Sequence, residues 1–136
     1  LLKAKSVHLM VTDIPYGVQK GTAGKQDSIG GTLKAALPAW HDALKPGGVL
    51  VINSSIIDRK AERDDIQVVY CDANGIAEAV GNPKGANVAI LGAVMGKVDI
   101  TSIESMTEAI RIELGEKKLR FLEGNMKALE AGMAAV

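Results

Sequence analysis

Residues 81 to 96 read Gly-Asn-Pro-Lys-Gly-Ala-Asn-Val-Ala-Ile-Leu-Gly-Ala-Val-Met-Gly. From Ala86 onward the residues are almost all apolar and small, which predicts a buried helix over 86–96. The run Gly81-Asn82-Pro83 predicts the end of a preceding helix, because glycine past the end and proline just beyond are typical stop signals. Gly92 and Gly96 allow a neighbouring backbone to approach closely, although each costs up to about 1 kcal/mol relative to alanine.

Aliphatic runs around this helix predict strands. Val49 to Ile52 is a continuous run, as expected for a central strand covered on both faces. Two further strands are predicted over 7–12 and 66–70, with a solvated charged loop over 58–65. Pro46-Gly47-Gly48 is predicted to stop a helix that either begins at Thr32 and kinks at Pro38 or begins near Pro38.

Three more helices are predicted by their caps and by apolar residues at helical spacing. Asp72 or Asn74 is expected to cap a helix ending at 80, and Thr101 with Glu104 to form the capping box of a helix ending at Gly115. The last helix is predicted from Leu119 to Met133. This alternation of strands and helices predicts one α/β domain over 1–136, a Rossmann-like layered fold with a mainly parallel sheet and a helical C-terminal part.

Composition excludes several classes of function. The 136 residues include 16 basic and 16 acidic side chains, so the net charge of zero gives no basis for binding nucleic acid or an anionic membrane. No apolar run reaches about 18 residues, so no transmembrane helix is expected. Cys71 is the only cysteine, which excludes an internal disulfide and an iron–sulfur cluster held by this chain alone. The expected compartment is the reducing cytoplasm.

From Lys45 to the C-terminus, an ordered set of short motifs covers about two-thirds of the chain. They are Lys45-Pro46-Gly47-Gly48-Val49-Leu50-Val51-Ile52-Asn53-Ser54-Ser55, Ile76-Ala77-Glu78, Gly81-Asn82, Asn87 with Leu91-Gly92-Ala93, and Asn125-Met126-Lys127-Ala128-Leu129-Glu130-Ala131-Gly132. In this order they resemble the gamma subunit of 2-oxoacid:ferredoxin oxidoreductases, over about residues 45–136.

The resemblance implies a subunit of an enzyme that oxidatively decarboxylates pyruvate or related 2-oxoacids. That family uses thiamine diphosphate and coenzyme A and passes electrons to ferredoxin, with iron–sulfur clusters in the complex. Thiamine diphosphate is held mainly by other subunits, so the resemblance implies no cofactor bound by this chain alone, no catalytic residue and no activity in isolation. The implied partners are the other subunits and, through the complex, ferredoxin.

The first third of the chain carries a second resemblance. Asp13-Ile14-Pro15-Tyr16-Gly17, within residues 11–52, resembles the Asp-Pro-Pro-Tyr region of S-adenosylmethionine-dependent amino-group methyltransferases. It would imply that Asp13 and the Pro15 backbone hold a target amine and that Tyr16 stacks on a planar base. No glycine precedes Asp13 to form the cofactor loop of such enzymes. Residues 1–44 are therefore interpreted as methyltransferase-like and 45–136 as gamma-like, in a chimera, a fragment or an inactive recombined or designed scaffold.

Several polar residues are candidates for a surface that faces partners or cofactors. Asn53 and Ser54, with Ser55, follow the predicted central strand, and the carboxyl ends of parallel strands line the usual binding crevice of α/β sheets. A helix cap or turn is the alternative role for them. Asn82 and Asn87 match the Gly-Asn…Asn pair of the gamma family, and a structural role is favoured because an asparagine inside a buried helix needs a hydrogen-bond partner. No metal site is expected, and Cys71 is interpreted as a buried small hydrophobe.

Overall fold

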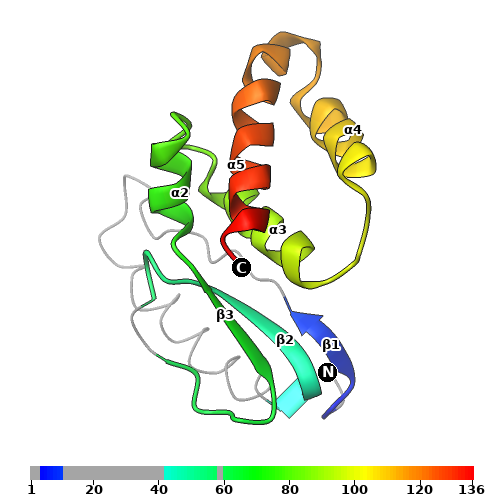
Figure 1. Cartoon of the computed structure of the whole chain (residues 1–136). Helices are drawn as coiled ribbons and strands as arrows, with labels where there is room; N and C mark the ends of the chain where they lie inside the picture. Colours follow the sequence, from blue (N-terminus) through cyan, green and yellow to red (C-terminus); the bar gives the residue numbers. More distant parts are fainter. Residues whose placement is uncertain (1–3, 11–41, 58–59) are drawn as a thin grey trace, which may run out of the picture. The chain divides into compact units, whose positions relative to one another are not determined.

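The computed structural model describes residues 4–10, 42–57 and 60–136. Within these ranges a three-stranded sheet has the order β1 (Val7–Met10), β2 (Leu44–Asn53) and β3 (Gln67–Cys71). β1 pairs with β2 in parallel, as the sequence predicts for this α/β fold. The helices that follow are α2 (Ala73–Ala79), α3 (Ala86–Lys97), α4 (Ile103–Leu114) and α5 (Leu122–Ala134), with a 3-10 helix, η1 (Glu116–Phe121), before α5 (Figure 1).

β2 is longer than predicted and contains the turn residues. The ladder pairs Val7 with Leu44 and then Leu9 with Val49, so its register shifts across Lys45–Gly48. Gly47 has φ +76°, a left-handed conformation that glycine adopts without steric cost. The prediction that Pro46-Gly47-Gly48 separates a helix from a strand is therefore wrong for Leu44, which already lies in β2, and the turn becomes an irregularity inside the strand.

The chain divides into two compact units, one formed by 1–50 with 63–67 and the other by 51–62 with 68–136. In the described part of the first unit, Arg63 clamps the start of β2. Its Nη1 donates to the Leu44 carbonyl at 2.9 Å, and its Nε and Nη2 each bond the Asp65 carboxylate at 2.7 Å. The Gly47 N–H donates to the Asp65 carbonyl at 2.6 Å. The loop predicted over 58–65 is confirmed for residues 60–65, and its charged side chains hold the irregular strand.

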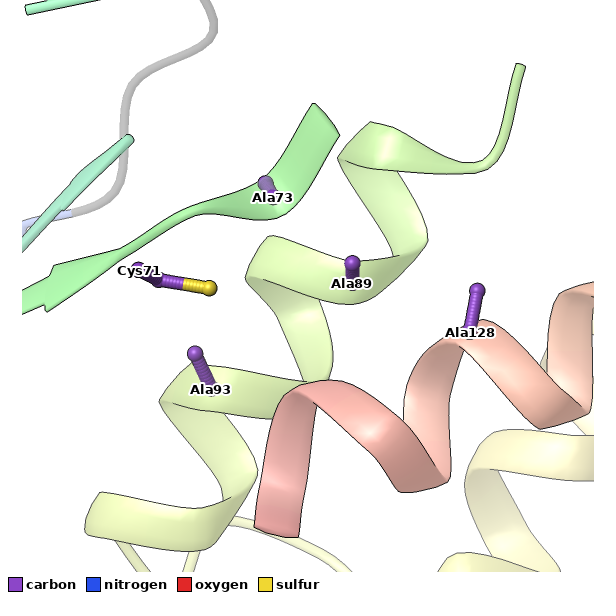
Figure 2. Packing of buried hydrophobic residues seen from close by; sticks show 5 residues of the cluster. All are labelled: Cys71, Ala73, Ala89, Ala93 and Ala128. Carbon is purple, nitrogen blue, oxygen red and sulfur yellow. The ribbon is translucent and has the colours of Figure 1, made fainter. Parts of the chain in front are cut away.

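The core of the second unit is built from small residues on three elements. Cys71 at the end of β3 is 1% exposed and points toward α3, where Ala89 and Ala93 lie, as Figure 2 shows. Ala128 on α5 is fully buried in the same cluster. The prediction that Cys71 is a buried small hydrophobe is confirmed, and burial raises the pKa of its thiol.

α3 and α5 pack so closely that glycine is needed on both helices. A Cβ on Gly92 would collide with the carbonyl oxygen of Leu129, and a Cβ on Gly132 would collide with that of Ala89. A Cβ on Gly96 would lie 2.6 Å from the Met133 carbonyl oxygen. The predicted close backbone approach at Gly92 and Gly96 is confirmed, and α5 is the element that approaches.

α2 ends as the sequence predicts. Gly81 has φ +75° and its N–H donates to the Glu78 carbonyl at 2.9 Å, while the Asn82 N–H donates to the Ala77 carbonyl at 2.8 Å. This pair of bonds is a Schellman motif, which satisfies carbonyls left open at a helix end. It also places Asn82 immediately beyond α2.

The C-terminal helices differ from prediction at their starts. Ser102, not Thr101, caps α4, because its side chain accepts from the Ser105 N–H at 3.2 Å. Gly115 ends α4 with φ +62°, as predicted. The predicted helix from Leu119 is two elements, because η1 occupies Glu116–Phe121 and α5 begins only at Leu122. α4 contains no buried residue, and within the described residues no helix is long and apolar enough to cross a membrane.

Candidate functional site

A polar network joins the ends of β2 and β3. Asn53, the last residue of β2, donates from Nδ2 to the Asn74 Oδ1 at 3.1 Å, and its own Oδ1 accepts from the Ser55 N–H at 3.1 Å. The Ser55 hydroxyl donates to Asp72 and accepts from the Asn74 N–H at 3.0 Å. The two strand ends and the start of α2 are therefore fixed by side chains as well as by the sheet.

Asp72 is the centre of this network and the cap of α2. Its carboxylate accepts from the Ser55 hydroxyl and from the Gly75 N–H, the latter at 3.1 Å. These two donors hold the pKa of Asp72 below its usual value, because they stabilise the charged carboxylate. A Cβ on Gly75 would collide with that carboxylate. Asp72 thus caps a helix, which decides between the two caps that the sequence left open.

At this edge of the sheet, the Ser54 hydroxyl is a polar group that the described part of the fold does not use. Its side chain is exposed and has no hydrogen-bond partner among the described residues, while its N–H donates to the Cys71 carbonyl at 2.9 Å. One Nδ2 hydrogen of Asn53 and the Nδ2 group of Asn74 are also unused within the described part. The edge therefore offers amide and hydroxyl donors to a carbonyl, carboxylate or phosphate group.

Asn82 lies in a second polar group, between the α2–α3 loop and α5. Its Nδ2 donates to the Asn125 Oδ1 at 3.4 Å, and the Asn125 Nδ2 donates to the Phe121 carbonyl at 2.9 Å. Gly85 and Gly124 flank the Asn82 side chain, and a Cβ on Gly85 would lie 2.5 Å from its Nδ2. This contact supplies a structural role for Asn82, since it ties the loop before α3 to the first turn of α5.

Asn87 differs from its prediction. It lies in the first turn of α3 but its side chain is exposed, so burial does not demand a protein hydrogen-bond partner. It has none among the described residues. The structure therefore does not bring Asn87 into either polar group, although it lies near Gly85 in the same loop-to-helix passage.

The first unit contributes a charged hollow. Its lining includes Lys5, Asp42, Arg63 and Asp65. The Arg63 hydrogen bonds hold the pKa of Asp65 below its usual value, and Asp65 in turn raises the pKa of Arg63. Acid and base neutralise each other here, so this hollow has no excess charge with which to select an ionic ligand.

The chemistry of the implied cofactors can be compared with the residues present. An iron–sulfur cluster takes several cysteine thiolates, whereas Cys71 is the only cysteine of the chain and is buried. In the described part, no group of three His, Cys, Asp or Glu side chains could by itself hold a metal ion. One buried cysteine does not fit an iron–sulfur cluster.

Sequence reasoning places Ser55 at the strand end with Asn53 but misses the other connecting members of both polar groups. Asp72 and Asn74, predicted only as alternative caps, complete the network around Asn53, and Asn125 completes the one around Asn82. A signal was available, because Asp72 directly follows the second predicted strand, at the edge where Asn53 follows the first. The methyltransferase candidates Asp13, Pro15 and Tyr16 lie outside the described residues.

Comparison with protein families gives a match over nearly the whole sequence. A model described as pyruvate ferredoxin/flavodoxin oxidoreductase matches residues 7–135. The match runs through Asp13, Pro15 and Tyr16, and nothing in the comparisons supports the methyltransferase resemblance. A search of curated proteins finds no significant match.

Among solved structures, the chain is similar to the gamma subunit of a keto/oxoacid ferredoxin oxidoreductase from Geobacter sulfurreducens PCA. The two share 28% sequence identity with a TM-score of 0.61, over 76% of this chain. This chain spans 59% of that gamma subunit's length. The likeness extends to the α/β architecture with its helical C-terminal part.

Proposed function

Because the chain belongs to the pyruvate ferredoxin/flavodoxin oxidoreductase family, we propose that it is a gamma-type subunit or domain of a 2-oxoacid:ferredoxin oxidoreductase. In this role it assembles with the subunits that hold thiamine diphosphate and iron–sulfur clusters, and it has no complete catalytic centre of its own. The complex decarboxylates a pyruvate-type 2-oxoacid, transfers the acyl group to coenzyme A and passes the electrons to ferredoxin in the cytoplasm.

The observation that carries this proposal is the family match over residues 7–135, joined to the likeness with a solved gamma subunit. The match covers both compact units, so it does not depend on one motif. The polar residues of the described part agree with a supporting role. Asp72 is engaged as a cap, and Asn53, Asn74 and Asn82 fix loops.

We assign the partner-facing role first to Ser54 and Asn87. Both side chains are exposed and neither is used by the fold within the described residues. Asn53 and Asn82 support them from behind, since Asn53 fixes the turn that carries Ser54 and Asn82 fixes the loop before α3. A neighbouring subunit or its bound cofactor would accept hydrogen bonds from these amides and hydroxyls.

The test is reconstitution of the complex. The chain is co-expressed with the candidate thiamine-binding and iron–sulfur subunits, and the assembly is sized by light scattering. The expected result is a stable hetero-complex that reduces an electron acceptor only when a 2-oxoacid and coenzyme A are present. Omission of this chain should abolish or strongly weaken that reaction. A folded chain that fails to join these subunits, or a complex equally active without it, would overturn the proposal.

A matched pair of variants tests the partner-facing assignment. Ser54→Ala and Asn87→Ala each remove an exposed side-chain group that the described fold does not use, so both should leave the free energy of unfolding within about 0.5 kcal/mol of wild type. Assembly with the partner subunits should nevertheless weaken. Ser105→Ala serves as the control for assembly, because it removes an exposed hydroxyl on α4 whose hydrogen-bond partner, the Ser102 hydroxyl, lies in the cap of the same helix. Unchanged assembly in both variants would contradict the assignment.

A further inference from the structure

η1 is a segment of the second unit that the core does not use. All six of its residues, Glu116–Phe121, are exposed, and so is Gly115 before it. Runs of 3-10 helix longer than three or four residues are uncommon, because their hydrogen-bond geometry is poorer than that of an α-helix. Burial therefore does not explain the side chains that η1 carries.

The 3-10 geometry arranges these side chains in a defined way. With three residues per turn, Lys117 lies in line with Arg120, and Lys118 lies in line with Phe121. The Arg120 guanidinium carbon lies 4.8 Å from the centre of the Phe121 ring, a cation–π contact. Two adjacent faces of η1 thus form one surface of three cations around a half-exposed aromatic ring, which we call the basic η1 surface (Lys117, Lys118, Arg120 and Phe121).

The three cations of this surface are not neutralised by the described part of the chain. Arg111 on α4 pairs with Glu108 at 2.6 Å, and Lys127 on α5 pairs with Glu123 at 2.7 Å. Lys117, Lys118 and Arg120 form no ion pair with a described residue. Within η1 these three cations stand against one carboxylate, that of Glu116, so the six-residue helix carries two more positive than negative side chains in a chain of zero net charge.

From these observations we infer that the basic η1 surface docks on an acidic patch of another subunit of the oxidoreductase. Carboxylates of that patch pair with Lys117, Lys118 and Arg120, and an apolar group covers Phe121. Arginine and aromatic residues are enriched at protein interfaces, and complementary charge selects the partner and speeds the encounter. The inference rests on the proposed function, because it names the surface by which this chain joins the complex.

A nucleic-acid partner fits this surface less well. Glu116 lies in the same 3-10 helix and Glu113 lies near the end of α4, and neither forms an ion pair with a described residue. These carboxylates would repel a continuous line of phosphates. A protein surface with a few separated carboxylates meets the three cations without that repulsion.

The experiment measures the affinity of the purified chain for the partner subunits at low and high salt. Lys118→Glu with Arg120→Glu reverses two charges on the surface, and Phe121→Ala removes the ring. Lys60→Glu with Lys97→Glu reverses two exposed charges elsewhere in the same unit and is the matched control.

The surface charge variant should bind about tenfold more weakly and lose most of its salt dependence, and Phe121→Ala should weaken binding about tenfold. The control should stay within about twofold of wild type.

The other outcomes separate the failure of this inference from that of the proposed function. If the wild-type chain joins the partner subunits and the surface variants join them equally well, the docking surface is wrong and the function stands. If the control weakens binding as much as the surface variant, general charge and not this surface governs binding. If the chain binds no partner subunit, function and inference fall together. If the free wild-type chain self-associates and the surface variant stays monomeric, the partner is a second copy of this chain and the inference is overturned.

Discussion

The helix pair α3–α5 and the segment α4–η1 are neighbours in one unit, yet they use opposite kinds of residue. α3 and α5 bring backbone against backbone through Gly92, Gly132 and buried alanines. α4 and η1 contain no buried residue, and Ile112 of α4 is 67% exposed. Small residues therefore hold α3 against α5, while the larger exposed side chains of α4 and η1 are available for other contacts.

The largest expected effect is at the contact between α3 and α5. Gly92→Ala places a methyl group against the Leu129 backbone, which cannot move aside as a flexible side chain can. We expect it to lower the free energy of unfolding by about 3 kcal/mol, because overpacking of a close contact forces a backbone shift. Urea unfolding followed by circular dichroism measures this loss.

Gly124→Ala on α5 is the matched control for Gly92→Ala. The nearest atom to its new Cβ is 3.6 Å away, an ordinary contact, and alanine favours helix by up to about 1 kcal/mol. It should leave stability unchanged or raise it. If the two glycine variants had the same stability, the close approach of α3 and α5 would be wrong, and with it the contrast between the two regions.

A smaller effect is expected where α5 begins, beside η1. Asn125→Ala removes the bond to the Phe121 carbonyl and the acceptor for Asn82, and should cost about 1 kcal/mol. Asn82→Ala and the double variant complete a thermodynamic cycle. Because the two side chains meet at 3.4 Å, we expect a coupling energy of only about 0.5 kcal/mol. A coupling of zero would show that Asn82 and Asn125 act separately.

How much of this was predictable depends on the range of the interaction. The glycines of α3 and the stop at Gly81 are predicted from the sequence, and the cap of α2 is narrowed to Asp72 or Asn74, because local backbone chemistry decides these features. The start of β2 was predicted wrongly because Arg63 and Asp65, distant in sequence, hold Leu44 and Gly47. The networks around Asn53 and Asn82 were predicted only in part, since Asp72 and Asn125 reach them through the fold.

Because Asp72 caps α2, we expect a small pH dependence of the free energy of unfolding of the second unit. Its pKa is lowered in the folded chain, first by the Ser55 hydroxyl and then by the Gly75 N–H. The stability it contributes is therefore fully present above the unfolded pKa of about 3.9 and is lost as pH falls through the lower folded value. Asp72→Asn keeps an oxygen acceptor but cannot titrate.

The measurement is the urea midpoint of wild type and Asp72→Asn from neutral pH down to about pH 3. The difference between the two should shrink in the acid range, where the wild-type carboxylate takes up its proton. Asp65, Glu104, Glu108 and Glu123 also have lowered pKa values, but they are present in both proteins and cancel in the difference. A difference that does not change with pH would show that the Asp72 charge does not contribute to stability.

The smallest effect is expected on α4, where Ile112 faces away from the apolar positions Ile103 and Ile110 by about half a helical turn. Ile112→Gln should change the free energy of unfolding by less than about 0.5 kcal/mol, because little apolar surface is buried at that position.

Leu129→Gln, at a fully buried site on α5, should by contrast cost several times more, since it buries an amide without a partner. The ratio of the two losses in the same urea experiment sharpens the comparison between the packed pair and the exposed segment. If Ile112→Gln proved as damaging as Leu129→Gln, Ile112 would have to be buried in solution, and α4 would then belong to the core instead of to an exposed surface.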